Sequence, residues 1–315
     1  MLTNLLTSLE VTLPIFAIIA LGWLLRRNEV LNENFVLRTN DLIFRVALPA
    51  KLFIDVSSSD LRATMNIKFV SLAVGVTLLC ILLAWIFGSH FLKEPSEQGA
   101  FIHGAFRGNF AYVGLTLLQN LIGTQVLALG AVIMATVVPI YNIAGVVILT
   151  LKKTDAEKPK FGRLLIDVVK TPMIAAILIA IPFSLLQIKL PFIIEKPLSY
   201  LSVMVAPLAL LCVGAGVRLE SIRGDLRKIL PACAFKLILQ PLLMVPAAIW
   251  LGLSGPEVMV LLILAGVPSA VNVYIITQKM GGDGEMASAI VVLSTALSIV
   301  TLTIWLFVLK TIGIW

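Results

Sequence analysis

The most informative residues of this chain are polar groups inside apolar sequence. The stretch "FRGNFAYVGL", residues 106–115, places Arg107 two residues before Asn109, and no Asp or Glu occurs between Glu97 and Asp155. An arginine at the centre of an apolar span costs about 2.5–3.5 kcal/mol on insertion into a membrane, so such a residue is usually functional. A guanidinium without a nearby carboxylate predicts a binding site for an anion.

A second stretch has the features of a broken helix. "LAGVPSAVNVY", residues 264–274, contains Pro268, which removes a backbone donor in mid-helix. We expect both stretches to unwind, one around Gly108 and one at Pro268, and the two breaks to cross. The N–H groups at the starts of the second half-helices would then face one cavity and favour a negative charge.

The elements that must position these residues are membrane-spanning helices. Of the 315 residues, 59% are hydrophobic and 13% are charged, whereas soluble domains contain about 25% charged residues. The mean hydropathy is +1.04, and backbone groups in lipid must be paired within helices. We predict an all-α membrane protein with ten transmembrane helices, at approximately 9–26, 37–55, 68–88, 97–121, 125–150, 164–186, 197–218, 229–251, 257–279 and 286–309.

A weak internal repeat divides these spans into two sets of five. A shift of 158 residues aligns "VTLPIFAII" (11–19) with "VKTPMIAAI" (169–177), and a shift of 159 places Asn109 opposite Pro268. Because each set has an odd number of spans, the two sets are inverted relative to each other, as in many secondary transporters. We predict a first five-helix repeat over 1–150, a cytoplasmic linker at 151–163 and a second, inverted repeat over 164–315, with broken helices in spans 4 and 9.

The distribution of basic residues predicts the orientation. Lysine and arginine are concentrated in the loops that follow odd-numbered spans, for example at Arg26, Arg27, Lys152 and Lys153. Such loops are cytoplasmic by the positive-inside rule, so we expect both termini on the non-cytoplasmic side of a plasma membrane. The net charge of +7 is accounted for by these loops, and we expect the lipid bilayer and no nucleic acid as a partner.

The candidate binding set combines the two broken stretches with one further cation from "FKLILQPLL" in span 8. Its members are Arg107, Asn109, Phe110, Ser269, Asn272 and Lys236, with Gly108 and Pro268 as the helix-crossover residues.

Other roles stay open for several of these residues. Arg107 could pair with Asp41 or Asp55, and the two asparagines could merely cap half-helices. His103, one helical turn before Arg107, could relay protons or make an ordinary polar contact between helices. The three cysteines and two histidines lack metal-ligand spacing, and no nucleophile motif indicates an enzyme. We therefore expect no metal, no cofactor and no catalytic residue.

These stretches resemble bacterial members of the auxin efflux carrier family of secondary transporters. The similarity is carried by "LPAKLF" in span 2, "RGNFAYVGL" in span 4, "VPSAVNVYIITQKMGGD" in span 9 and "AIVVLSTALSIVTL" in span 10, and it extends over essentially the whole chain. By position, Asn109 and Pro268 match the crossover residues of the family, and Arg107 matches a bacterial variant of the motif.

The resemblance implies a fold, a motion and a class of substrate. It implies ten spans in two inverted repeats, with spans 4 and 9 crossing at mid-membrane in a bacterial inner membrane. It also implies an elevator-like motion of the crossing helices against a scaffold of spans 1, 2, 6 and 7. Plant members of the family export indole-3-acetate, and bacterial members are associated with malate or malonate.

We therefore predict a secondary transporter, and more specifically an efflux carrier, for small organic carboxylate anions such as malate, malonate or auxin-like acids. A membrane potential of 100 mV, negative inside, favours export of each negative charge by about 2.3 kcal/mol, whereas uptake would require protons or sodium. The alternative is a sodium- or proton-coupled transporter of a different solute on the same crossed-helix fold. A homodimer is one option for the assembly.

Overall fold

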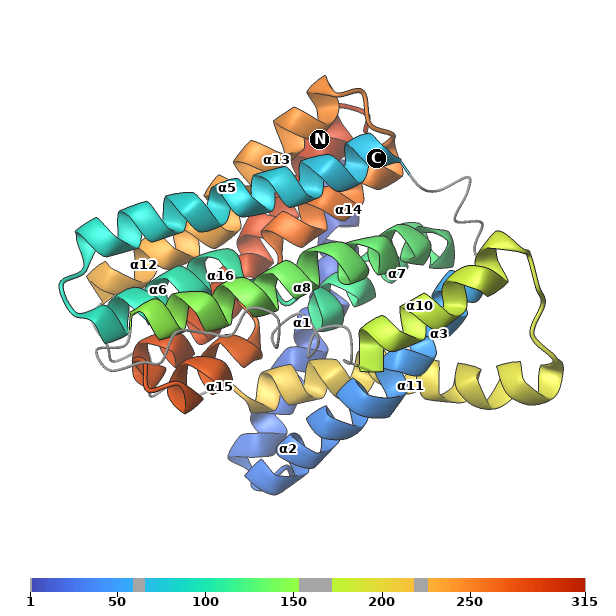
Figure 1. Ribbon diagram of the computed structural model, residues 1–315, viewed down its shortest axis with the longest axis horizontal. Helices are drawn as coiled ribbons and strands as arrows, with labels where there is room; N and C mark the ends of the chain where they lie inside the picture. The colour runs from blue at the N-terminus through green and yellow to red at the C-terminus, as the bar shows by residue number, and fades with distance from the viewer. Residues whose placement is uncertain (1, 59–65, 153–171, 218–225, 315) are drawn as a thin grey trace.

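The structure is a computed structural model that describes residues 2–58, 66–152, 172–217 and 226–314 (Figure 1). These residues form helices joined by turns and short extended connections, which confirms the predicted all-α class. The elements are α1 (Leu2–Arg27), α2 (Glu33–Leu42), the π-helix η1 (Ile43–Ala47), α3 (Leu48–Ser57), α5 (Ile67–Phe91), α6 (Pro95–Phe106), the π-helix η2 (Phe110–Gly114), α7 (Leu115–Ile122), the 3₁₀ turn η3 (Thr124–Val126), α8 (Leu127–Leu151), α10 (Pro172–Leu185), α11 (Phe192–Ala215), α12 (Leu226–Ala234), the π-helix η5 (Phe235–Leu239), α13 (Gln240–Trp250), α14 (Gly255–Gly266), α15 (Val271–Lys279) and α16 (Gly284–Thr311).

Each of the ten predicted ranges contains helix in its described residues. Length and composition mark five stretches of the described chain as able to cross a membrane, namely Ile67–Phe91, Leu127–Leu151, Phe192–Ala215, Leu226–Trp250 and Gly284–Thr311. Most of the linker predicted at 151–163 lies outside the described residues.

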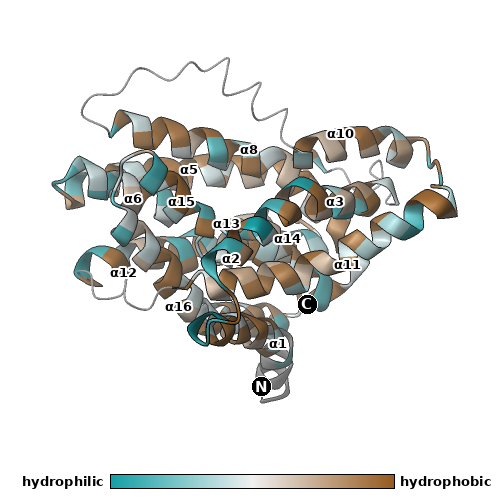
Figure 2. Cartoon of the chain, turned by 90° about the horizontal axis from the view of Figure 1, so that it is seen from below, coloured by the Kyte–Doolittle hydropathy of each residue, from teal (hydrophilic) through white to brown (hydrophobic). Residues whose placement is uncertain are grey.

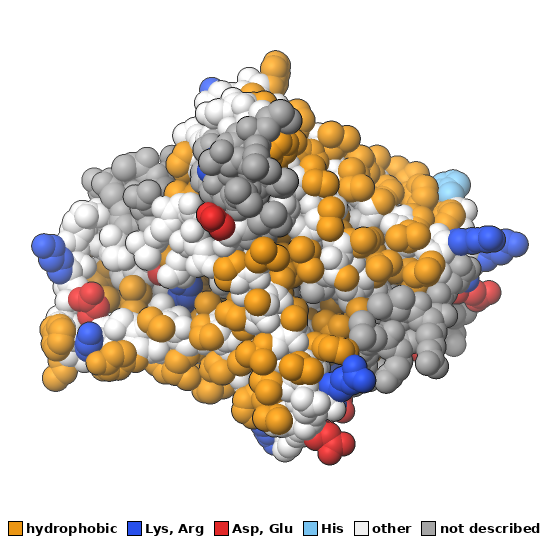
Figure 3. Space-filling view, turned by 180° about the vertical axis from the view of Figure 1, so that it is seen from behind, with side chains coloured by type: hydrophobic (Ala, Val, Ile, Leu, Met, Phe, Trp, Pro, Cys, Tyr) orange, Lys and Arg blue, Asp and Glu red, His pale blue; other side chains and the backbone are white. Residues whose placement is uncertain are grey.

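Many large hydrophobic side chains lie on the outer surface of the described helices. On α5, Ala73, Cys80 and Ala84 are buried at helical spacing, while Leu78 and Leu82 on the opposite side are exposed. Figure 2 shows hydrophobic residues along most of the helices, and Figure 3 shows hydrophobic side chains spread over much of one face, with most of the charged side chains toward its edges. Exposed leucine and isoleucine at this density fit a lipid environment.

The helices pack in two groups (Figure 1). The flanking group consists of α1, α2, η1, α3, α10 and α11, in which α11 packs against both α1 and α3, and α10 packs against α3. The crossing group consists of α5 to α8 and α12 to α16, in which α6 and α14 carry the two interrupted stretches. The flanking group contains the helices of predicted spans 1, 2, 6 and 7.

Within the flanking group, α1 and α11 approach at backbone distance. A Cβ atom added to Gly22 would collide with the carbonyl group of Leu211, and one added to Gly214 would collide with the carbonyl group of Ile19. These two glycines therefore allow the close crossing of α1 and α11.

Candidate functional site

Two helices of the crossing group are interrupted where the sequence indicates. α6 ends at Phe106, and Arg107 has an extended backbone (φ −85°, ψ 105°) before helix resumes at Phe110. α14 ends at Gly266, and α15 begins at Val271. Proline forces the residue before it out of the helical region, and Val267, which precedes Pro268, has φ −64° and ψ 150°.

The two interruptions pair with each other through their backbones. Gly108 and Ser269 form an antiparallel bridge. The N–H of Asn109 donates to the carbonyl oxygen of Pro268 (2.8 Å), and the N–H of Ala270 donates to that of Arg107 (3.2 Å). This short pairing satisfies backbone groups that the broken helices leave unpaired, and it joins residues about 160 positions apart in the chain.

Lys236 and Gln240 bind the ends of the first half-helices. The Nζ of Lys236 donates to the carbonyl oxygens of Leu264 (3.2 Å) and Ala265 (2.6 Å) and to Oε1 of Gln240 (2.8 Å). The Nε2 of Gln240 donates in turn to the carbonyl oxygens of two residues at the end of α6, at 3.0 and 3.1 Å. A cation at helix C-termini balances the partial negative charge of their free carbonyls.

Arg107 is buried beside the paired interruptions without a carboxylate partner in the described part of the chain. Its Nη2 donates to Oδ1 of Asn142 on α8 (2.7 Å), and its Nη1 lies 3.4 Å from Nε2 of His103. The two acids considered as partners are engaged elsewhere: Asp41 pairs with Arg45 (2.6 Å), and Asp55 pairs with Lys51 (3.2 Å).

His103 is fully buried and uses both ring nitrogens within the protein. Its Nδ1 lies 3.2 Å from Oγ1 of Thr277 on α15, and its Nε2 faces Arg107. A guanidinium can only donate, so Nε2 accepts and Nδ1 carries the proton that is donated to Thr277. A Cβ atom added to Gly145 would lie 2.7 Å from Nε2, so α8 leaves room for the imidazole at that position.

The remaining predicted residues are distributed over different environments. Phe110 is 1% exposed and packs in the hydrophobic core. Ser269 is buried, and its hydroxyl donates to the carbonyl oxygen of Gly104 (2.7 Å). Asn272 is exposed in the first turn of α15. The structure therefore brings Arg107, Asn109, Gly108, Pro268 and Ser269 together at the crossing, whereas Asn272 faces outward.

The starts of the second half-helices differ from the ends of the first. Asn109 precedes η2 and Ala270 precedes α15, and neither provides a side-chain cap. Asn109 is 6% exposed, and its side chain forms no hydrogen bond with the described residues. The crossing thus combines the guanidinium of Arg107, a free amide and uncapped N–H groups, and this combination favours an anion.

Several contact residues of this network were not predicted, among them Asn142, Gln240 and Thr277. Asn142 lies in "VVPIYNIAG" of span 5, and Gln240 follows Lys236 at the i,i+4 spacing in span 8. An amide in otherwise apolar sequence was the available signal for Asn142 and for Gln240.

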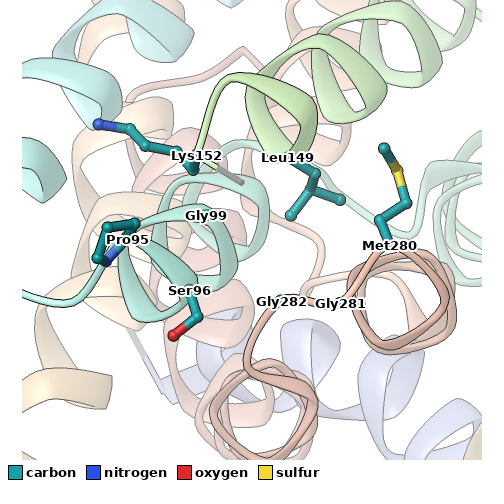
Figure 4. Close-up of a pocket in the computed structure, with 8 residues that line it drawn as sticks. All are labelled: Pro95, Ser96, Gly99, Leu149, Lys152, Met280, Gly281 and Gly282. Atoms are coloured by element: carbon teal, nitrogen blue, oxygen red, sulfur yellow. The ribbon is translucent and has the colours of Figure 1, made fainter. Parts of the chain in front are cut away.

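A separate cleft lies at the other end of α6 (Figure 4). It is small and is lined by Pro95, Ser96, Gly99, Leu149, Lys152 and Met280 to Gly282. The Lys152 amine points away from Met280 (Figure 4), donates to Ser89 Oγ (2.8 Å) and Gln98 Oε1 (2.7 Å), and lies 4.5 Å from the centre of the Trp85 ring. Burial lowers the pKa of Lys152. This cleft contains none of the predicted site residues.

The sequence profile of the family described as "Membrane transport protein" matches residues 7–306. The chain belongs to this family. The match covers nearly the whole chain and confirms the resemblance to bacterial auxin efflux carriers. This member of the membrane transport protein family is therefore a multi-pass membrane transport protein and not an enzyme.

Relatives in bacteria and archaea support the same family. The chain is 29% identical over 315 residues to a Rhizobium meliloti protein named "Putative malonate transporter", with 95% of this chain and 94% of the relative covered. It is 24% identical over 310 residues to "Uncharacterized transporter YfdV" of Escherichia coli (96% and 97% covered). It is also 22% identical over 313 residues to an uncharacterized transporter of Methanocaldococcus jannaschii (96% and 98% covered).

Proposed function

We propose that this chain is a secondary transporter of small organic carboxylate anions, with malonate and malate as the first substrates to test. The observation that carries the proposal is Arg107, a buried guanidinium that has no carboxylate partner among the described residues and lies beside two uncapped half-helix starts. An unpaired cation in this setting is stabilised when an anion binds. The name of the Rhizobium meliloti relative adds malonate as a specific candidate.

The site residues have separate roles in this proposal. Arg107 binds a carboxylate through the donors that Asn142 and His103 leave free, and Asn109 donates its unpaired amide to the same anion. The hydroxyl of Ser269 fixes the paired backbones through its hydrogen bond to Gly104, and Phe110 forms the apolar wall of the binding site. Asn272, exposed on the first turn of α15, contacts the substrate on its way to the crossing.

The proposed architecture has ten transmembrane helices in two inverted five-helix repeats. Its support is that each predicted range contains helix in its described residues and that the interruptions at 107–109 and 267–270 are related by nearly the same shift as the sequence repeat. We further propose that the crossing group moves against the flanking group in an elevator-type cycle. Both termini would lie on the non-cytoplasmic side of the inner membrane.

The test is transport by purified protein in liposomes. Radiolabelled malonate, malate and indole-3-acetate are offered to wild type, Arg107→Gln, Arg107→Lys and, as a control, Arg45→Gln, which removes an exposed arginine. Loss of a buried charge-assisted contact costs about 2–5 kcal/mol, so Arg107→Gln should slow carboxylate transport by about 30-fold or more. Arg107→Lys keeps the charge without the planar fork and should fall between Arg107→Gln and wild type.

Two results would contradict the proposal. An Arg107→Gln variant that transports like Arg45→Gln would assign Arg107 a structural role. A wild type that moves none of the three acids under any imposed potential or pH gradient would favour the alternative, a sodium- or proton-coupled transporter of another solute. Thermal unfolding of each variant separates loss of transport from loss of fold.

A further inference from the structure

Asp55 on α3 is partly buried and differs in its hydrogen bonds from Glu257, a buried acid at the start of α14. Its side chain is 10% exposed, and its Oδ2 accepts no aligned hydrogen bond although Lys51 Nζ lies 3.2 Å away. Glu257, by contrast, accepts hydrogen bonds from Asn66 and from Ser254 in a complete capping box. Asp55 therefore retains a buried carboxylate oxygen that lacks the donors a stable carboxylate requires.

The position of this carboxylate links the two helix groups. The Nζ of Lys51, which Asp55 faces, donates to Oε1 of Gln119 on α7 (3.2 Å). α3 belongs to the flanking group and α7 to the crossing group, and the side chain of Lys51 is 6% exposed. A charge change at Asp55 would therefore act on a contact between the two groups.

Among the residues that the structure describes, the charged group in contact with Asp55 is Lys51. α7 and α10 contain no ionisable side chain, and Arg45 on η1 is paired with Asp41. Tyr141 on α8 packs against Phe106. The ionisable residues of α11, which also packs against α3, are Glu195, Lys196, Tyr200 and Cys212.

We propose that Asp55 is a proton-binding site that couples proton movement to carboxylate transport, an inference that rests on the transport function proposed above. A proton from water on one side of the membrane forms an O–H bond with the carboxylate of Asp55, and the same bond breaks when the proton leaves on the other side. The ammonium of Lys51 already occupies the cation position between Asp55 and Gln119, so a proton fits this site and a sodium ion does not.

Charge balance provides the coupling. While Asp55 is ionised, its charge cancels that of Lys51. A proton on Asp55 leaves the charge of Lys51 uncompensated in the low-dielectric interior, and a bound carboxylate monoanion supplies the opposite charge. Each ligand therefore favours binding of the other, and by linkage the effect is reciprocal. Protonation of Asp55 also removes the ion pair that positions Lys51, and it thereby weakens the hydrogen bond from Lys51 to Gln119.

The experiment uses the full chain in liposomes, with labelled malonate outside and either an acid-outside pH gradient or an inward sodium gradient. The variants are Asp55→Asn and the matched Asp41→Asn, which removes an acid from an exposed i,i+4 pair. In wild type and Asp41→Asn, the pH gradient should accelerate uptake and the sodium gradient should not. Asp55→Asn should lose the acceleration but retain malonate exchange at equal pH. A full response of Asp55→Asn to the pH gradient would overturn the proposal.

A second measurement does not depend on transport. Infrared difference spectra between acid and neutral pH should contain one protonated-carboxyl component, present in wild type and Asp41→Asn, that is missing from Asp55→Asn. A spectrum of Asp55→Asn that keeps every carboxyl component of wild type would overturn the proton site. If wild type transports no carboxylate, the proposed function fails while this spectrum still tests Asp55. If Asp55→Asn does not fold, the double variant Lys51→Met/Asp55→Asn takes its place, because removing both charges of a buried pair is often tolerated.

Discussion

Arg107 and Lys236 are both buried cations at the crossing, and their hydrogen bonds distinguish them. Lys236 has three N–H donors, and all three have protein acceptors at 2.6–3.2 Å. Arg107 has five N–H donors. Among the described side chains, its acceptors are Oδ1 of Asn142 and Nε2 of His103. Lys236 is thus saturated by the fold, whereas Arg107 retains donors for a ligand. Unused donor capacity, more than charge or burial, separates a binding cation from a structural one.

The helix ends beside each cation reinforce this difference. Lys236 lies at the carbonyl ends of α6 and α14, directly or through Gln240, where a positive charge is stabilised. Arg107 precedes the start of η2, where a positive charge is disfavoured unless an anion accompanies it. At the crossing, the protein itself therefore neutralises the partial negative charge of the helix C-termini, whereas the positive charge beside the start of η2 is available to an anion.

The largest expected effect on stability is that of Lys236→Met. It leaves the carbonyls of Leu264 and Ala265 and the Oε1 of Gln240 buried without donors. Breaking one side of such a buried network typically costs about 3–5 kcal/mol. Thermal unfolding in detergent should therefore show a markedly lower midpoint than wild type.

The control for this variant is Lys68→Met, which removes an exposed lysine at the start of α5 and should unfold like wild type. If Lys236→Met keeps its unfolding midpoint but loses malonate transport, Lys236 binds substrate, as the sequence had suggested, and the distinction between the two cations is wrong.

The breaks themselves could be predicted from the sequence because they depend on local chemistry. Pro268 cannot continue a helical hydrogen-bond ladder, and Arg107 in uncharged sequence identifies a special position. The same local reasoning located the helices, since the apolar runs are long and separated by turns. The prediction that spans 4 and 9 contain matching interruptions rested on these residues together with the weak repeat.

The division of roles between the cations could not be predicted in the same way. The acceptors of Lys236 are backbone carbonyls 28 and 29 residues away, and carbonyls carry no signature in a sequence. The i,i+4 spacing of Asp41 with Arg45 and of Lys51 with Asp55 is visible in the sequence, but it does not reveal that the first pair is exposed and the second buried.

A smaller effect is expected from Gly108→Ala, which alters the contact between the crossing and Lys236. The added Cβ atom would lie 2.9 Å from Cε and 3.0 Å from Nζ of Lys236, and 3.0 Å from Cγ2 of Val267. Lys236 forms three hydrogen bonds, so a shift of its side chain would weaken them. Overpacking of this kind costs about 1–3 kcal/mol of stability.

The matched control is Gly75→Ala on α5, where an added Cβ meets no atom within 4 Å. It should raise stability by up to about 1 kcal/mol, because alanine favours helix over glycine. The measurement is the unfolding midpoint of both variants. Equal unfolding midpoints for Gly108→Ala and Gly75→Ala would show that Lys236 can make room for the added Cβ atom at no cost in stability.

The smallest expected effect is that of Asn142→Ala, which leaves the fold intact and acts on the position of Arg107. It removes the acceptor at 2.7 Å from Nη2, and a hydrogen bond to a charged group contributes about 1.5–3 kcal/mol. Because water or substrate can replace part of that contact at a half-buried residue, we expect the KM for malonate to rise about fivefold, equivalent to about 1 kcal/mol, with little change in kcat. Asn120→Ala, an exposed amide on α7, should leave both constants unchanged. A KM for Asn142→Ala equal to that of wild type would mean that His103 alone orients the guanidinium, and the donors assigned to the ligand would then have to be recounted.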